Sequence, residues 1–210
     1  MNMLASGLVT VGDVEGGLRV YRAVLQYWRR RGNERTDWSN ILAAQTNIAT
    51  CLHDLGREDE CLEIYRHVYE LRVGLAKRGA PEAVRDMLSL ARNLATQLYV
   101  MRRLQEAKKL LLEQIPLAQR VLGAESSITL AMRMTLAKVR CGLLGKMPKA
   151  RHDSPEMKKG LDGVLAEMED VARTINRIYG PSHPYAREIN SMTTFARNLK
   201  LEHAPLFRSN

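Results

Sequence analysis

The residues best suited to catalysis are the cysteines and histidines, which supply most nucleophiles, bases and metal ligands in proteins. Cys51 and His53 lie two positions apart on one predicted helix. Their side chains therefore point about 200° apart and cannot act together as nucleophile and base. His152, Asp153 and Ser154 contain the side-chain types of a catalytic triad, but three successive loop residues cannot reach triad geometry. We predict that the protein is not an enzyme.

Metal and cofactor motifs are absent from the sequence. It contains no GxxxxGK[ST], GxGxxG or HExxH pattern. The five histidines show no paired metal-ligand spacing: His53, His67, His152, His183 and His203. The odd count of three cysteines, with no CxxC pair, argues against a zinc ribbon or a disulfide framework. We expect no metal, no cofactor and no small-molecule substrate. We interpret Cys51, Cys61 and Cys141 as small core or interface residues, and we expect a cytoplasmic protein.

The elements that carry these residues are predicted to be helices. Apolar residues follow the i, i+3, i+4, i+7 spacing of a helix, as in Ile41, Ile48, Leu52 and Leu55, and no segment alternates like a strand. No stretch is long and apolar enough to span a membrane. With Gly and Pro as punctuation, the sequence predicts an all-α chain with helices over 2–11, 13–31, 37–55, 58–78, 81–101, 104–122, 126–144, 156–179 and 183–201.

Self-similarity is the strongest signal in the sequence. The triplet 47–49 (Asn-Ile-Ala) recurs 46 residues later as 93–95 (Asn-Leu-Ala). Residues 56–61 have a counterpart in 102–107 at the same offset of 46 residues. Residues 12–17 and 135–137 fit the same frame. Periods of this size with two helices each indicate a helical solenoid, because one helix pair cannot bury its apolar face alone.

These patterns resemble the tetratricopeptide repeat (TPR) in its longer, kinesin light chain-like form. The segments RVLGAESSITLAMRMTLA (120–137) and RIYGPSHPYAREI (177–189) are similar to the joint between repeats in that form. Arg102 stands where a turn Gly is typical, while Gly17 and Cys61 replace the usual small Ala. The resemblance implies a right-handed solenoid domain over 1–201, with units of about 1–34, 35–79, 80–123 and 124–180 and a closing helix 181–201. The Pro, Gly and charge content of 145–160 predicts an inserted loop, and we expect a flexible tail over 202–210.

The resemblance also implies where a partner binds. In this family the first helix of each pair lines a concave groove, and matching polar positions fall in the second and third units. They are Thr46, Asn47, Thr50 and His53, and Arg92, Asn93, Thr96 and Tyr99. An Asn amide both donates and accepts, so Asn47 and Asn93 could hold a peptide backbone; the alternative is that they bond to a neighbouring helix.

The charge distribution suggests the kind of partner. Residues 92–159 hold 14 Lys and Arg against 5 Asp and Glu, so the whole formal excess of +9 lies there. This segment could attract an acidic peptide or protein, or it could consist of solvated helix faces. We expect a scaffold that binds an extended, acidic peptide or partner protein. The alternative function is an RNA-binding helical repeat protein that uses the basic segment.

Overall fold

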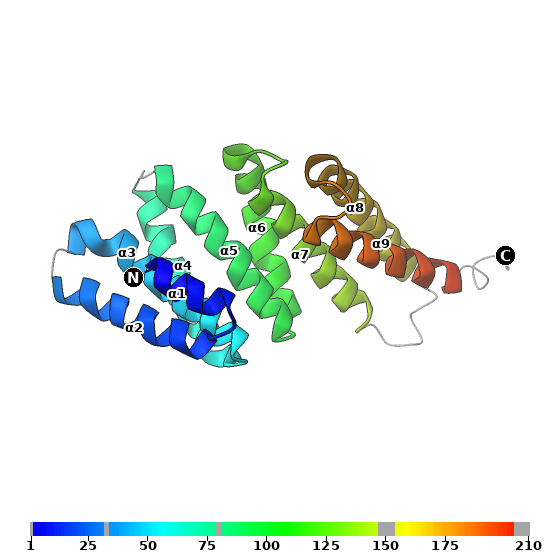
Figure 1. Ribbon diagram of the computed structural model, residues 1–210. Coiled ribbons are helices and arrows are strands. Elements are labelled where there is room, and N and C mark those ends of the chain that lie inside the picture. Colours follow the sequence, from blue (N-terminus) through cyan, green and yellow to red (C-terminus); the bar gives the residue numbers. More distant parts are fainter. Residues whose placement is uncertain (1, 32–33, 79–80, 147–153, 204–210) are drawn as a thin grey trace. The chain divides into compact units, whose positions relative to one another are not determined.

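The structure is a computed structural model that describes residues 2–31, 34–78, 81–146 and 154–203 (Figure 1). Within these ranges all regular structure is α-helical, which confirms the predicted fold class. The helices, in chain order, are α1 (Asn2–Thr10), α2 (Val14–Arg31), α3 (Glu34–Asp54), α4 (Glu58–Lys77), α5 (Pro81–Val100), α6 (Leu104–Leu122), α7 (Ser127–Leu144), α8 (Pro155–Tyr179) and α9 (Pro184–His203).

The helix ends follow from local capping chemistry. The Ser126 hydroxyl accepts a hydrogen bond from the Thr129 backbone N–H at the start of α7, at 3.2 Å. Helices α6 and α8 are followed by Gly123 and Gly180, whose φ values of 91° and 78° lie in the left-handed region that favours glycine. These signals are readable in the sequence, so most predicted ends hold to within a few residues.

Two predicted segments need correction. The inserted loop was expected over 145–160, but α8 begins at Pro155, so residues 155–160 are helical. Ser154 caps this helix by accepting from the Met157 N–H at 3.2 Å, and Pro155 suits the first helical position because it needs no N–H partner there. The flexible tail was expected from residue 202, but α9 continues to His203. The rest of both segments, 147–153 and 204–210, lies outside the described residues.

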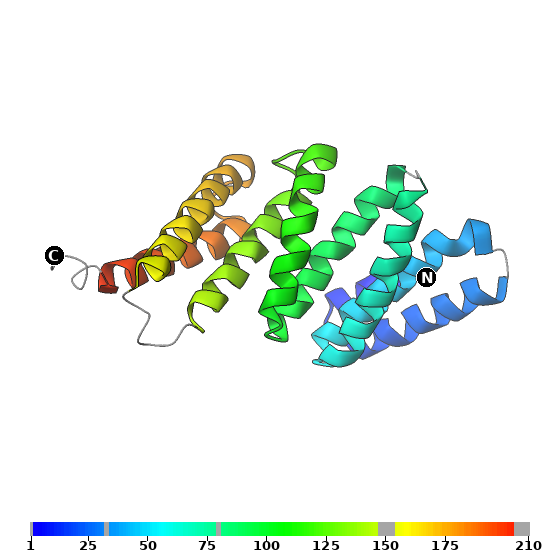
Figure 2. The ribbon, with the colours of Figure 1, turned by 180° about the vertical axis from the view of Figure 1, so that it is seen from behind.

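The chain divides into two compact units, residues 1–101 and 102–210. In the first unit each helix from α1 to α5 packs on the next, and successive helices run antiparallel (Figures 1 and 2). Its core is aliphatic and includes Leu18, Leu42, Leu52, Val68 and Leu88. The predicted small-residue positions are closely packed: a Cβ on Gly17 would lie 2.4 Å from Val9 Cγ2, and Cys61 is fully buried.

The second unit contains α6 to α9, which also pack in sequence order. Leu130, Met134, Val164, Met168 and Ile189 belong to its buried core. The boundary between the two units falls between α5 and α6, which are the two helices of the predicted third repeat. The predicted limits of the repeats therefore remain predictions.

The turns between paired helices share a residue with positive φ. Gly12 and Gly56 have φ values of 94° and 71°. Arg102, which the sequence alignment of the repeats places at the same position, has φ 58° and is the non-glycine residue with positive φ in the described chain. A left-handed conformation costs an L-residue roughly 1–2 kcal/mol, so Arg102 is kept at a position where glycine would be more stable.

Candidate functional site

The four predicted contact residues of the second repeat lie on the last three turns of α3. The Thr46 hydroxyl donates to the Leu42 carbonyl at 2.8 Å, and the Thr50 hydroxyl lies 3.1 Å from both the Thr46 carbonyl and the Tyr65 hydroxyl of α4. Asn47 and His53 are half-buried. Both threonines therefore use their hydroxyls within the protein, whereas the Asn47 amide has no hydrogen-bond partner in the described part of the chain.

The predicted residues of the third repeat lie on α5. The Thr96 hydroxyl donates to the Arg92 carbonyl at 3.0 Å. Arg92, Asn93 and Tyr99 are half-buried, whereas Thr96 is exposed. Within the described residues, neither Asn47 nor Asn93 makes a side-chain hydrogen bond, and the Arg92 guanidinium makes no ion pair. Among the residues that the structure describes, these three polar side chains therefore have no partner.

The carboxylate of Glu58, at the start of α4, links α3 to α5. Glu58 Oε2 lies 3.1 Å from His53 Nδ1 of α3 and also accepts a hydrogen bond from Gln97 Nε2 of α5. Gln97 Nε2 donates in addition to the Glu58 backbone carbonyl at 3.1 Å. Gln97 is almost completely buried, so this amide depends on Glu58 for its hydrogen bonds. We call Glu58, His53 and Gln97 the Glu58 junction.

Electrostatics agree with this geometry. Burial alone would raise the pKa of Glu58, but the hydrogen bonds from Gln97 and His53 outweigh it and hold the pKa below its usual value. Burial raises the pKa of the Tyr65 phenol to about 12, while the charge of Arg92 acts in the opposite direction. Burial therefore dominates for the Tyr65 phenol, whereas hydrogen bonding dominates for the Glu58 carboxylate.

Sequence reasoning missed Glu58, Tyr65 and Gln97. The signal for Gln97 was present, because it lies at helical spacing from the apolar Leu94, Val100 and Met101. Glu58 gave no such signal, since it reads as one of three acidic residues that favour a helix N-terminus. Its role depends on groups from two other helices, which the sequence does not bring together.

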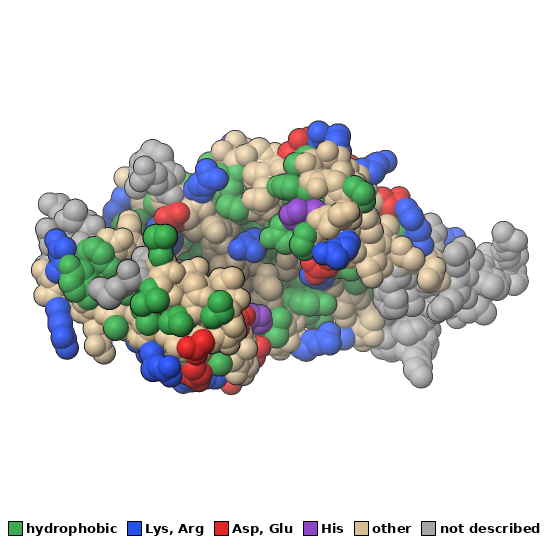
Figure 3. Space-filling view, viewed as in Figure 1, with side chains coloured by type: hydrophobic (Ala, Val, Ile, Leu, Met, Phe, Trp, Pro, Cys, Tyr) green, Lys and Arg blue, Asp and Glu red, His purple; other side chains and the backbone are tan. Residues whose placement is uncertain are grey.

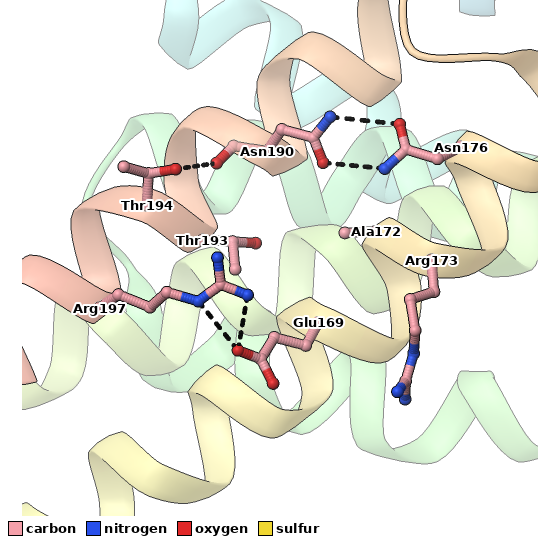
Figure 4. Close-up of a pocket in the computed structure, with 8 residues that line it drawn as sticks. All are labelled: Glu169, Ala172, Arg173, Asn176, Asn190, Thr193, Thr194 and Arg197. Atoms are coloured by element: carbon pink, nitrogen blue, oxygen red, sulfur yellow. Dashed lines mark hydrogen bonds and ion pairs between the residues drawn. The ribbon is translucent and has the colours of Figure 1, made fainter.

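A second candidate site lies between α8 and α9 in the second unit, and the sequence did not predict it. It is a pocket of about 340 Å³ (Figure 4). Its lining is mostly polar and comprises Glu169, Ala172, Arg173, Asn176, Asn190, Thr193, Thr194 and Arg197. The signal that could have found it is Asn190, Thr194 and Arg197, which follow one another at helical spacing on the closing helix.

The polar groups of this pocket are already ordered. Asn176 and Asn190 form a reciprocal amide pair, with N–O distances of 3.0 and 3.2 Å (Figure 4). Arg197 donates twice to Glu169 Oε1, from Nε at 3.0 Å and from the terminal Nη2 at 2.8 Å. The exposed Arg173 extends away from these groups. Each Asn of the pair retains further donor or acceptor capacity for a ligand.

Several cations of the basic segment are neutralised within the second unit. Arg133 pairs with Asp170 and Arg140 with Glu167, both at 2.8 Å. Lys138 pairs with Glu188. Figure 3 shows acidic side chains beside several of the basic ones on the visible face. The segment is therefore less positive as a surface than its composition suggests.

The chemistry considered for catalysis finds no support in the site. Cys51 is buried, and burial raises the pKa of its thiol, which disfavours the nucleophilic thiolate. Burial raises the pKa of Cys61 to about 12. His53 bonds to Glu58, while His152 and Asp153 lie outside the described residues. The part of the chain that the structure describes contains no group of three or more His, Cys, Asp or Glu side chains able to hold a metal ion.

Comparison with known proteins identifies the fold. Two similar structures are of a Podospora anserina protein described as a kinesin light chain with nearly identical TPR-like repeats, one of them a variant. The variant is 18% identical with a TM-score of 0.63, covering 97% of this chain and 91% of that one. The other is 19% identical with a TM-score of 0.62, covering 99% and 93%. BtubC (BKLC) from P. vanneervenii is 16% identical with a TM-score of 0.53, covering 93% and 77%.

The chain therefore has the fold of a helical-repeat protein. More particularly, it has a TPR-like repeat fold with kinesin light chain-like structural neighbours, as the sequence predicted. No family model matches the sequence, and no curated protein matches it. Among the described helices, none combines the length and apolar character needed to cross a membrane.

Proposed function

We propose that the protein is a non-catalytic scaffold that binds an extended, acidic peptide of a partner protein. The observation that carries this proposal is the pair of half-buried amides of Asn47 and Asn93, which have no hydrogen-bond partner among the described residues. They occupy matching positions on α3 and α5. A side-chain amide can pair with both the C=O and the N–H of an extended backbone, so it binds a peptide without reading its sequence.

The Glu58 junction supports the proposal because it orders the helices that carry these amides. Glu58 bonds to His53 on α3 and to Gln97 on α5. Gln97 lies one helical turn after Asn93, and His53 lies six residues after Asn47. A site whose contact groups are held in place before binding loses less conformational entropy when the ligand arrives. We infer that the junction pre-organises the peptide contacts of the first unit.

Arg92 supports the preference for acidic peptides. It is half-buried, precedes Asn93 directly and has no ion-pair partner among the described residues. A guanidinium in this setting gains a charge-assisted hydrogen bond when a carboxylate arrives. The location that we propose is cytoplasmic, where the three free cysteines would stay reduced.

The test is a peptide array probed with the wild type and with Asn93→Ala and Arg92→Ala. Asn93→Ala should weaken all bound peptides alike, by about 1 kcal/mol for one neutral hydrogen bond. Arg92→Ala should weaken acidic peptides selectively, by up to about 3 kcal/mol, and this part should shrink as salt rises beyond about 0.1 M. Arg19→Ala is the matched control, because Arg19 is exposed on α2.

Single-stranded RNA belongs in the same assay. Binding of RNA more tightly than any peptide, together with no effect of either substitution on peptides, would replace the scaffold by the RNA-binding alternative. The salt dependence of RNA binding is a second way to distinguish the two functions. Each phosphate of a single strand that the protein neutralises steepens the slope of log K against log salt by about 0.7.

A further inference from the structure

A cationic hollow lies where α6 begins and α7 ends. It has a volume of about 470 Å³, and Arg102, Arg103, Leu104, Leu143 and Lys146 are among its lining residues. The two helices run antiparallel and pack on each other, so the start of one and the end of the other meet at one edge of the second unit (Figure 2). None of these residues belongs to the proposed peptide contacts.

The side chains of the hollow converge from two helices. Lys146 Nζ donates to the backbone carbonyl of Arg102 at 3.4 Å, which brings its ammonium beside the Arg102 turn. Leu104 is buried and Leu143 half-buried, so these two leucines supply an apolar part of the lining. The hollow therefore combines positive charge with apolar surface.

The charges of the hollow leave an excess of two. Arg103 Nε donates to Glu106 Oε1 at 2.6 Å, so these two lining residues neutralise each other. Arg102 and Lys146 have no acidic partner among the described residues. Two positive charges thus remain in the lining of the hollow, and an anion of charge −2 would match them.

The first unit provides an internal comparison. Its equivalent turn is Gly56 with Arg57, followed by Glu58, Asp59 and Glu60. That turn has positive φ at Gly56, as this one has at Arg102, but it is rich in carboxylates. The turn as such therefore requires neither an arginine at its positive-φ position nor a cationic surface. The charge of the hollow is a property of the second unit's own sequence.

We propose that this hollow binds a phosphate monoester dianion. Arg102 and Lys146 neutralise the phosphate, and the half-buried Leu143 contacts the organic group that carries it. The dianion matches the excess of two charges, whereas a carboxylate would leave one cation unpaired. The volume also exceeds what a bare phosphate needs and falls in the range of about 300–1,000 Å³ that is usual for small-molecule sites.

The test is isothermal titration calorimetry of the full chain at pH 8 and constant ionic strength. The probes are N-acetyl-phosphoserine amide, inorganic phosphate and N-acetyl-aspartate amide. The phosphoserine probe should bind most tightly, because it alone combines a dianion with an organic body. If inorganic phosphate binds as tightly as the phosphoserine probe, the site takes free phosphate instead. If the aspartate probe binds as tightly as the phosphoserine probe, the site does not recognise dianions. Either result overturns the proposal.

Variants distinguish binding at this site from general electrostatic attraction to the positively charged protein. Arg102→Gly and Lys146→Gln should each weaken the phosphoserine probe about tenfold, as expected for loss of a charge-assisted hydrogen bond. Lys109→Gln is the control, because Lys109 is an exposed lysine of α6 outside the lining. Equal weakening in all three variants would show diffuse electrostatic attraction and overturn the proposal.

Two further readouts exclude a merely structural role. Arg102→Gly should raise the thermal midpoint while it weakens binding, because glycine relieves the positive φ at this position. Lost binding in a more stable protein cannot result from misfolding. Binding to the wild type should also fall as the pH drops through the second phosphate pKa of about 6. Binding that is equally tight at pH 5 and pH 8 would contradict recognition of the dianion.

Discussion

Replacing Glu58 by Gln tests the Glu58 junction. The substitution preserves size but removes the charge that accepts hydrogen bonds from Gln97 and His53. Hydrogen bonds to a charged group contribute roughly 1.5–3 kcal/mol each. Because Gln97 keeps its bond to the Glu58 backbone carbonyl, and the Glu58 side chain is 30% exposed, we expect a total loss of about 1–2 kcal/mol.

The assay is urea and thermal unfolding of Glu58→Gln beside Glu63→Gln, a conservative change at an exposed position of the same helix. A loss of this size should lower the thermal midpoint by several degrees, given roughly 2–4 °C per kcal/mol for a chain of about 200 residues. Glu63→Gln should leave the midpoint unchanged, because surface substitutions without specific contacts rarely matter.

The pH dependence gives the sharper test. The folded-state pKa of Glu58 lies below its ordinary value of 4.5, so its contribution to stability is present above pH 4.5 and is lost as the pH falls through the folded pKa. The difference between wild type and Glu58→Gln should therefore be full at pH 7 and disappear in strong acid. If the difference persists at the lowest pH at which both proteins fold, or if Glu63→Gln is equally destabilised, the junction does not act as described.

Three further predictions concern packing, the α8–α9 pocket and the thiols. Ala107→Phe should lower the free energy of unfolding by about 1–3 kcal/mol through overpacking, whereas Ala166→Phe at an exposed position of α8 should be tolerated. Equal melting curves of the two variants would contradict the packing of Ala107. Asn176→Ala and Asn190→Ala should show a coupling energy of about 0.5–3 kcal/mol in a double-mutant cycle of urea unfolding, and additive effects would exclude the amide pair. Cys61, with its pKa raised to about 12, should react with a thiol reagent at pH 8 only after denaturant is added, and rapid labelling of the native protein would refute its burial.

The sequence by itself predicted the helices and the repeat fold, because both depend on local information. Apolar spacing, Gly after the helices and Ser before them act over a few residues, and they located α7 and α9 closely. Recurrence of Asn47 as Asn93 in the same frame was enough to identify a stack of helix pairs. The local signals at Ser154 and Pro155 also marked the start of α8, although the compositional bias of the segment before it led to an overlong loop.

The tertiary structure alone decided which polar groups are bonded and which are available. Glu58, Tyr65 and Gln97 come from two helices and gain their partners only when α3, α4 and α5 pack together. The net charge of residues 92–159 could be counted from the sequence, but the acids that neutralise Arg133, Lys138 and Arg140 lie on α8 and α9. Hydrogen bonds and ion pairs depend on distances of a few ångströms between segments far apart in the chain, and composition and periodicity carry no record of those distances.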